Sequence, residues 1–269
     1  MTLLAPFHFV GRTAAYTVEF IGAIGLLLRD AVVRAKPGLI TGRGKRLGRA
    51  NLWAQMVRVG VKSIGIISLV VFCIGAILSL QMQPILSQYG AVEKIADIIG
   101  IAMLRELGPL VAAITLTGFA GASIAAELGT MKVSEELEAL ESSAIDPVRF
   151  LVVPRVLATT VMMVCLAVIA DLMGVAGGLF VCSTLFGLSP EAYLDATFTA
   201  VKTRDFASGL LKSAVFGAAL SLIACHLGMT VRGGAAGVGD ATTKTVVYTI
   251  VALTFIDLGF TAVFYYLGF

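Results

Sequence analysis

Five long apolar runs constrain the fold of this chain more than any other feature. They cover about residues 63–83, 98–128, 150–186, 207–231 and 246–267. Roughly 20 apolar residues are enough for one helix to cross a bilayer. Because lipid offers no hydrogen-bond partners, the backbone of each run must pair within its own helix. The sequence therefore predicts an all-α integral membrane protein with five transmembrane helices.

The composition of the chain also indicates a membrane protein. Hydrophobic residues make up 58% of its 269 residues and charged residues only 14%, whereas a soluble domain has about 25% charged residues. The four cysteines all lie in apolar runs, where we expect them to act as small hydrophobic residues. We expect no metal site, and a single integral unit in which residues 1–62 precede a five-span domain over residues 63–269.

Basic residues orient these spans. Nine of them lie between Arg29 and Lys62, ahead of the first run, whereas the loop after that run has only Lys94, set beside Glu93 and Asp97. By the positive-inside rule, the N-terminus and the 129–155 connection lie in the cytoplasm. Five spans then place the C-terminus on the outer side of the membrane.

The segment Pro6–Arg34 has an apolar centre, but Arg12, Glu19 and Arg29 bracket that centre. If this segment spanned the bilayer, the basic block that follows it would face outward, against the charge rule. We therefore expect a helix that lies in the cytoplasmic interface, with its charges among the headgroups and its apolar side chains in the acyl region. A sixth span is the alternative.

Arg105 and Glu106 are the charged residues in the outer half of the second run. Ionisable side chains inside a membrane are costly, so they are functional candidates unless they form a structural ion pair near the interface. Neighbouring helix positions point about 100° apart, so the two side chains cannot face the same point. Glu106 adjoins the Gly108-Pro109 break, and we predict that it lines a cavity while Arg105 meets a neighbouring helix or the headgroups.

Prolines and small residues mark further features of the runs. Pro109 and Pro154 predict kinks in the second and third runs. Small residues at fourfold spacing predict close helix packing, within one chain or across a dimer. These positions are Gly118, Ala122 and Ala126 in the second run, and Gly209, Ser213, Gly217 and Ser221 in the fourth.

Two classes of enzyme are disfavoured by the motifs. Asp171 and Asp257 are intramembrane aspartates, as an aspartyl protease would need, but the Gly-Val-Gly-Asp string that ends at Asp240 precedes a helix, where Asp240 is expected to be an N-cap. The chain has no GxxxxGK[ST] motif, so it does not hydrolyse nucleotide through a P-loop. If ATP drives this protein, another subunit binds the ATP.

The segment 134–145 predicts a short acidic helix that leaves the membrane. Ser134 is expected to cap it, and Pro147 prevents its continuation. Leu137, Leu140 and Ile145 form its apolar side, which suits insertion into the groove of a soluble partner. The alternative is a cytoplasmic linker helix that binds nothing.

Three strings resemble the MlaE/YrbE family of ABC-transporter permeases. They are RELGPLVAA, AAELGTMKVSEELEALESSAIDPVRFLVVPRVLA and the late GVGDATTKTVV. The resemblance extends over nearly the whole chain. It implies a homodimeric permease in a bacterial inner membrane, with an interfacial N-terminal helix, five spans, a cytoplasmic N-terminus and a periplasmic C-terminus.

The resemblance also implies partners and a substrate. A cytoplasmic ABC ATPase would hydrolyse the ATP, with a STAS-domain protein as a possible companion and an MCE-domain lipid-binding protein in the periplasm. The cargo would be phospholipid moved between the inner and outer membranes, which affects outer-membrane lipid asymmetry. The chain itself would be no enzyme, would bind no cofactor and would have no nucleic-acid partner.

Site residues follow from the same resemblance. The family's Arg-Glu pair falls on Arg105 and Glu106, near the lipid cavity, and its coupling helix falls on about residues 132–142. The predicted lipid-cavity residues are Leu104, Arg105, Glu106, Leu107, Leu110 and Val111. The predicted ATPase-coupling residues are Lys132, Glu135, Glu136, Leu137, Leu140 and Glu141.

Two positions depart from the family pattern. Phe119 stands where the family commonly has a basic residue, and Asp240 stands where Arg or Lys is frequent. Both departures concern charge rather than fold. The alternative function is a membrane-embedded lipid-modifying enzyme, which would need a converging nucleophile or metal cluster that the sequence does not display. Co-purification with an ATPase would favour the permease, and turnover without partners would favour the enzyme.

Overall fold

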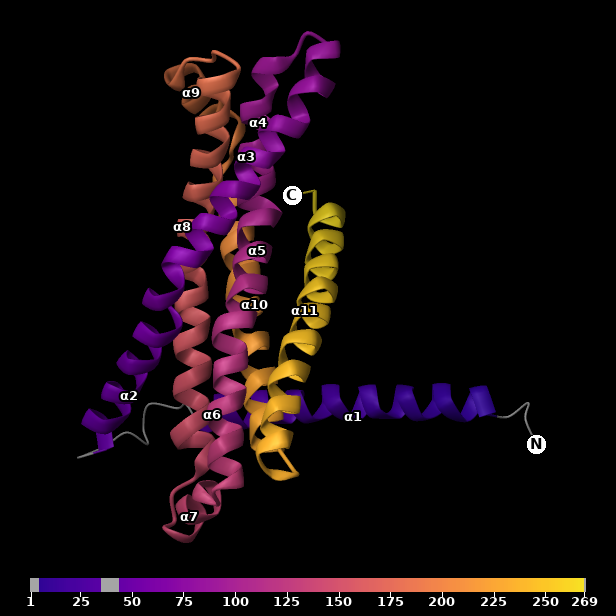
Figure 1. The fold of residues 1–269 in the computed structure, drawn as a ribbon, viewed down its shortest axis with the longest axis vertical. Coiled ribbons are helices and arrows are strands. Elements are labelled where there is room, and N and C mark those ends of the chain that lie inside the picture. The colour runs from indigo at the N-terminus through magenta and orange to yellow at the C-terminus, as the bar shows by residue number, and fades with distance from the viewer. Residues whose placement is uncertain (1–4, 35–43, 269) are drawn as a thin grey trace.

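The computed structural model describes residues 5–34 and 44–268, which form helices joined by short turns, with no β-strand in these ranges. Five of the helices are long, and several shorter ones extend or connect them (Figure 1). In chain order they are α1 (Ala5–Arg34), α2 (Gly44–Val59), α3 (Ile64–Gln88), α4 (Ile95–Ala102), α5 (Gly108–Leu116), α6 (Ala122–Val133), α7 (Glu136–Ser142), α8 (Val153–Leu185), α9 (Pro190–Ala200), α10 (Thr203–Met229) and α11 (Gly234–Tyr266).

Tighter and wider helical turns join some of these helices into longer segments. Two are 3-10 turns, η2 (Val61–Ser63) and η3 (Val92–Lys94). Three are π turns, η4 (Met103–Leu107), η5 (Thr117–Gly121) and η6 (Val148–Val152).

Five helical segments of the described chain are long and apolar enough to cross a membrane, as the sequence predicts. They are Asn51–Gln88, Val92–Val133, Val148–Leu185, Thr203–Met229 and Gly234–Tyr266. The last segment begins well before the predicted residue 246, because its small and polar start is helical and packs Ala241 and Thr245 into the bundle. Asp240 therefore lies inside α11 and pairs with Lys244 at 2.7 Å, so its predicted role as an N-cap is wrong.

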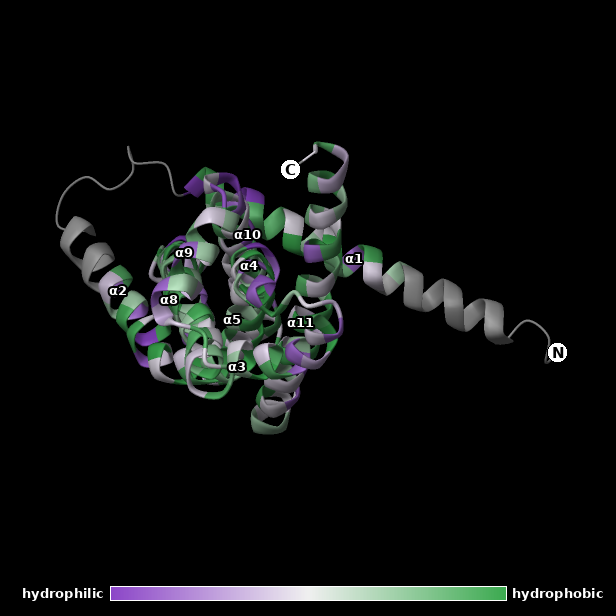
Figure 2. Cartoon of the chain, turned by 90° about the horizontal axis from the view of Figure 1, so that it is seen from above, coloured by the Kyte–Doolittle hydropathy of each residue, from purple (hydrophilic) through white to green (hydrophobic). Residues whose placement is uncertain are grey.

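The second span occupies the middle of the bundle. Its central helix α5 is surrounded by α3, α8, α10 and α11, whereas α1 and α2 lie at the periphery (Figure 2). The first helix, α1, runs across one end of the bundle, roughly at right angles to the spans (Figure 1). Phe20 of α1 makes edge-to-face contacts with His226 and Tyr248, at ring-centroid distances of 5.5 and 5.2 Å. This orientation agrees with the prediction of a helix parallel to the membrane surface.

Glycines allow α3 and α8 to touch through their backbones. A Cβ atom added at Gly75 of α3 would lie 2.0 Å from the carbonyl oxygen of Gly174 on α8. A Cβ added at Gly177 would lie 2.1 Å from the carbonyl oxygen of Phe72. Helices in lipid associate through such close packing of small residues rather than through hydrophobic exclusion.

The two prolines predicted to kink their spans each follow a π turn. Gly108 donates its N–H to the carbonyl of Met103, five residues back, immediately before Pro109. In the same way Val153 donates to Val148, immediately before Pro154. Since proline has no N–H and collides with the preceding turn, the wider π turn lets each helix continue past it. Both spans therefore continue past the prolines through a π turn, and the predicted kinks stay a prediction.

The small-residue positions of the fourth run face other helices. A Cβ added at Gly209 would lie 2.1 Å from the Leu104 carbonyl oxygen, and one at Gly217 would lie 2.8 Å from Cβ of Met163. The predicted close packing of this run is therefore confirmed within the chain. Gly118 of the second run has no atom within 4 Å of an added Cβ, so close packing at that position does not occur inside one chain.

Candidate functional site

A charged network joins three spans in the half of the bundle that lies away from α1. Its centre is Lys212 of α10, whose side chain is only 1% exposed. The Lys212 ammonium lies 2.6 Å from Glu106 of η4 and 3.0 Å from Asp257 of α11, and it also donates to the Thr261 hydroxyl at 3.0 Å. Thr261 in turn donates to the other carboxylate oxygen of Glu106 at 2.9 Å, which closes the network.

This network has two carboxylates for one ammonium. Lys212 is compensated twice, because a buried cation without partners is far too costly in an apolar medium. Asp257 is 15% exposed, whereas Glu106 keeps 36% of its side chain exposed. The network is therefore accessible from the Glu106 side and closed around Lys212.

Arg105 forms a second ion pair beside the first. Its Nε lies 3.1 Å from the carboxylate of Asp205, which also accepts the backbone N–H of Lys202 at the start of α10. Asp205 and Lys212 are seven residues apart on α10, or about two helical turns. Both Arg105 and Glu106 therefore meet α10, and the prediction that only one of them faces a neighbouring helix is wrong.

Sequence reasoning found Arg105 and Glu106 but missed their partners Lys212, Asp205 and Thr261. Lys212 could have been found, because it is an ionisable residue inside an apolar run and such residues are functional candidates. Asp205 lies where the run begins, and Thr261 is one of several threonines in the last span. Neither has a sequence signal that identifies it as a partner.

The apolar residues predicted to line a lipid cavity lie on the same central span. Leu104, Leu107, Leu110 and Val111 are half-buried and pack against the core. They lie next to the charged network on η4 and α5, and their contact with lipid stays a prediction.

The two intramembrane aspartates do not form a catalytic pair. Asp257 is bound to Lys212, whereas Asp171 of α8 is 4% exposed and neither of its oxygens has a hydrogen-bond partner among the described residues. Asp171 lies instead against Gly108, where an added Cβ would be 1.9 Å from its Oδ1. These two aspartates therefore do not form the pair of carboxylates that shares one proton in an aspartyl protease.

A second cluster of charged residues lies nearer to α1 and links α2, α6 and α8. Glu127 of α6 accepts from Arg58 of α2 at 2.5 Å and from Arg155 of α8 at 2.9 Å. Arg58 also donates to Ser123 at 2.9 Å, and Arg155, which is 2% exposed, donates to the Leu151 carbonyl. This arrangement joins three helices and supports a structural role for Glu127.

The predicted coupling segment forms a helix shorter than expected. Helix α7 spans Glu136–Ser142, and Ser134 does not cap it, because its hydroxyl donates instead to the Thr130 carbonyl at the end of α6. Lys132 belongs to α6 and donates to Glu138. That hydrogen bond holds the pKa of the Glu138 carboxyl below its ordinary value.

Leu137 does not face a partner. It is 5% exposed and belongs to the hydrophobic core, and Leu140 is half-buried against the same core. The predicted insertion of Leu137 into a groove of the ATPase is therefore not possible while α7 is packed in this way. Exposed residues of the segment include Glu135, Glu136 and Glu141, so α7 presents an acidic surface.

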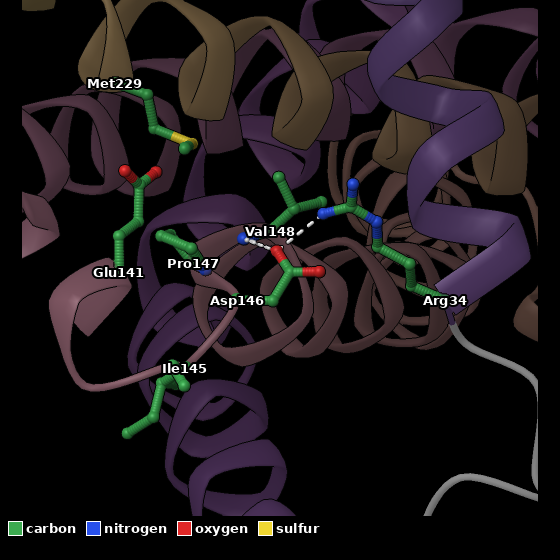
Figure 3. Close-up of a pocket in the computed structure, with 8 residues that line it drawn as sticks. Arg34, Glu141, Ile145, Asp146, Pro147, Val148 and Met229 are labelled. Carbon is green, nitrogen blue, oxygen red and sulfur yellow. Dashed lines mark hydrogen bonds and ion pairs between the residues drawn. The ribbon is translucent and has the colours of Figure 1, made fainter.

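A pocket of about 500 Å³ lies where α1, α7 and α10 approach one another. Its lining includes Arg34 at the end of α1, Glu141 of α7 and Met229 at the end of α10 (Figure 3). Asp146, which lies between α7 and η6, also lines it. Arg34 donates to Asp146 across one side of this pocket at 2.5 Å.

Comparison with known proteins assigns the chain to a family. The family model for the MlaE permease matches residues 52–263. A probable ABC transporter permease of Rickettsia prowazekii is 34% identical over 267 residues, which cover 98% of this chain and 99% of that protein. A probable ABC transporter permease of Synechocystis is 36% identical over 208 residues, which cover 77% and 79% of the two chains.

A plant protein is also similar. The chloroplastic protein Trigalactosyldiacylglycerol 1 of Arabidopsis thaliana is 33% identical over 215 residues, which cover 80% of this chain and 61% of that protein. The family match over residues 52–263 includes the central span with its charged network, α7 and most of the last span. The chain belongs to the MlaE family of ABC transporter permeases.

Proposed function

We propose that this permease moves phospholipid, or a related lipid, between the inner membrane and the outer membrane of a double-membrane bacterium. The observation that carries the proposal is the network of Glu106, Lys212, Asp257 and Thr261. It is enclosed by apolar spans, yet Glu106 remains more than one-third exposed. Ionisable groups inside a membrane are retained at substrate pathways because elsewhere they cost too much.

Lipid chemistry suits this arrangement. A lipid pathway needs apolar walls for acyl chains and a few polar groups that orient the headgroup. The half-buried Leu104, Leu107, Leu110 and Val111 would contact the chains, and the exposed edge of Glu106 and Arg105 would contact the headgroup. The name of the chloroplastic relative contains that of a glycerolipid, which supports a lipid substrate.

An ABC permease requires a partner ATPase, and we propose that this ATPase binds at α7 in the cytoplasm. The acidic surface of Glu135, Glu136 and Glu141 would contact it, while Lys132 holds Glu138 from the end of α6. We further propose a homodimer in the inner membrane with a periplasmic C-terminus. An MCE-domain protein would receive the lipid outside, and a STAS-domain protein would accompany the ATPase.

Lipid transfer by the reconstituted permease and its ATPase tests this function. The variant Glu106→Gln/Lys212→Met/Asp257→Asn removes every charge of the network together. Replacing a buried ion network by neutral side chains of similar size often leaves stability unchanged, so assembly and basal ATP hydrolysis should persist. Lipid transfer should fall about tenfold to a hundredfold, the equivalent of losing one charged hydrogen bond of about 1.5–3 kcal/mol.

The matched control is Lys94→Met/Asp97→Asn, which removes an exposed ion pair of 2.8 Å at the end of the bundle away from α1. This control should transfer lipid at the wild-type rate. If the neutral network variant also transfers lipid at that rate, the network does not act on the substrate and the proposal is wrong.

A further inference from the structure

Helix α7 is flanked by two residues that have a left-handed backbone conformation. Glu135, which precedes it, has φ 59°, and Ala144, which follows it, has φ 57°. Such angles are uncommon outside glycine and persist where the surrounding structure imposes them. Both residues are exposed and lie at the ends of a seven-residue helix. Residues at the ends of an element are the usual places where a hinge absorbs a change in backbone angles.

The carboxylate of Asp146 links the segment that follows α7 to two other elements. Asp146 Oδ1 accepts from Arg34 at 2.5 Å and from the backbone N–H of Val148 at 3.0 Å. Arg34 is the last residue of α1, and Val148 is the first residue of η6, where the third span begins. The Arg34–Asp146 salt bridge therefore links α1 to the segment that leaves α7.

Open space lies beside this salt bridge. The pocket of about 500 Å³ separates Arg34 and Asp146 from Glu141 and Met229, which lie on its other side (Figure 3). The segment between α7 and η6 therefore has open space on the side that faces Met229 of α10, although Pro147 within it is buried.

The salt bridge is suited to opening and closing. The side chains of Arg34 and Asp146 are 35% and 39% exposed, so water screens their attraction. Arg34 also lies 3.6 Å from Asp30, one turn earlier on α1. Arg34 thus keeps Asp30 as a partner when it leaves Asp146, and the partly exposed Asp146 carboxylate still accepts the Val148 N–H.

The opposite part of α1 has a different attachment. Phe20 packs against His226 of α10 and Tyr248 of α11. Phe20 and Arg34 are 14 residues apart, about 21 Å along a helix. Between these two points Ile24 and Leu27 also pack against the core and Ala31 is buried. Movement at Arg34 would therefore act first on the last turn of α1.

We propose that Arg34 and Asp146 are positioning residues that transmit movement of α7 to α1. This inference rests on the proposed function in one respect, namely that a cytoplasmic ATPase engages α7. When the ATPase moves α7, the chain bends at Glu135 on the near side of the helix, the segment that follows α7 moves with it, and Asp146 carries Arg34 along. Helix α1 then changes its angle beneath the spans and alters the lateral access of lipid to the bundle.

The transporter with its ATPase, reconstituted in phospholipid vesicles, provides the test. Arg34→Gln removes the ion pair, and Asp146→Asn removes its charge while keeping an oxygen for the Val148 N–H. Both variants should assemble and hydrolyse ATP as the wild type does. The number of lipids transferred per ATP should fall about two- to fivefold, as expected from loss of a partly exposed salt bridge. Arg34→Lys should restore most of the ratio.

The matched control is Arg29→Gln, which removes the same charge from α1 at a residue whose ion pair within the described part of the chain is with its neighbour Asp30. It should leave the ratio unchanged. If Arg34→Gln behaves as Arg29→Gln does, or if lipid transfer and ATP hydrolysis fall in proportion, the two residues do not couple α7 to α1 and the proposal is overturned.

A distance measurement separates this proposal from the proposed lipid substrate. Spin labels at Val32→Cys, near the moving end of α1, and Ala235→Cys on α11, both exposed positions, are placed in a chain whose exposed Cys73 and Cys165 are replaced by alanine. The distance between the labels should change when ATP binds the complex, and this change should be lost in Arg34→Gln. A change retained in Arg34→Gln overturns the coupling even if no lipid is moved. A change lost there supports the coupling whichever substrate is carried.

Discussion

Single residues decide how closely the spans approach and which charges they can hold. At Gly75 and Gly177 the missing side chain lets the backbones of α3 and α8 touch. At Lys212 the long side chain reaches two carboxylates and a hydroxyl from two other spans. The glycine contacts leave no room for a larger side chain. The Lys212 network, in contrast, is still accessible at Glu106, whose side chain is partly exposed.

The substitution Gly75→Ala should destabilise the protein, because the new Cβ would lie 2.0 Å from the Gly174 carbonyl oxygen. Overpacking of this kind costs about 1–3 kcal/mol, which should lower the thermal unfolding midpoint in detergent. Gly65→Ala on the same helix is the control, because nothing lies within 4 Å of its added Cβ. That change should be neutral or stabilising by about 0.5–1 kcal/mol. Equal midpoints for the two variants would contradict the close contact.

Sequence patterns identify charged positions more easily than they identify pairs. Arg105 and Glu106 are evident because charge is rare inside an apolar run. Their pairing with Asp205 and Lys212 depends on how the spans are rotated, and the π turn at 103–107 changes that rotation. A pattern based on regular α-helical spacing therefore cannot predict which partner each residue meets.

The helices predicted best are the membrane-spanning ones, because the surrounding lipid restricts which backbone structures are possible. The five spans follow from hydropathy because every backbone group in the membrane must be paired. The bounds of the last span were missed because its start, from Gly234, is small and polar but packs on other helices. The burial of Leu137 was missed because an amphipathic pattern indicates which residues share a face and not whether that face meets its own bundle or a partner.

Two substitutions on α7 should separate folding from docking. Leu137→Ala removes a core side chain and should cost about 2–5 kcal/mol of stability. Ala139→Trp, on the exposed side of the same helix, should leave the thermal midpoint unchanged but weaken binding of the ATPase, because a bulky ring prevents close approach. Thermal unfolding and ATPase pull-down distinguish the two effects. An Ala139→Trp variant that retains normal pull-down would show that the ATPase does not contact this face.

The whole molecule is a bundle with one helix laid across its end. The spans run along the long axis, and α1 crosses them at the end that also holds α7 (Figure 1). The connection between α3 and α4 and the helix α9 lie at the opposite end (Figure 1). This arrangement agrees with the orientation predicted from basic residues, which places α1 and α7 together in the cytoplasm.

Cysteine labelling should confirm this orientation. In a chain without Cys73 and Cys165, new cysteines at Val18 and Glu135 should react with a membrane-impermeant maleimide only from the cytoplasmic side. A cysteine at Tyr89, which is 78% exposed at the opposite end, should react only from the outer side. Failure of the Val18 position to react from either side, while Glu135 reacts from the cytoplasm, would indicate that the middle of α1 lies inside the membrane and that α1 spans it.

The π turn at 103–107 has a consequence for the gene as well as for the protein. A π turn closes over one residue more than an α turn, so it is equivalent to a one-codon insertion that the helix has absorbed. Deleting any one codon there would restore regular helix and rotate Arg105 or Glu106 by about 100° relative to α10. A deletion at Met103 or Leu104 is therefore expected to break the contacts of Arg105 and Glu106 with α10 even though both charged residues are kept.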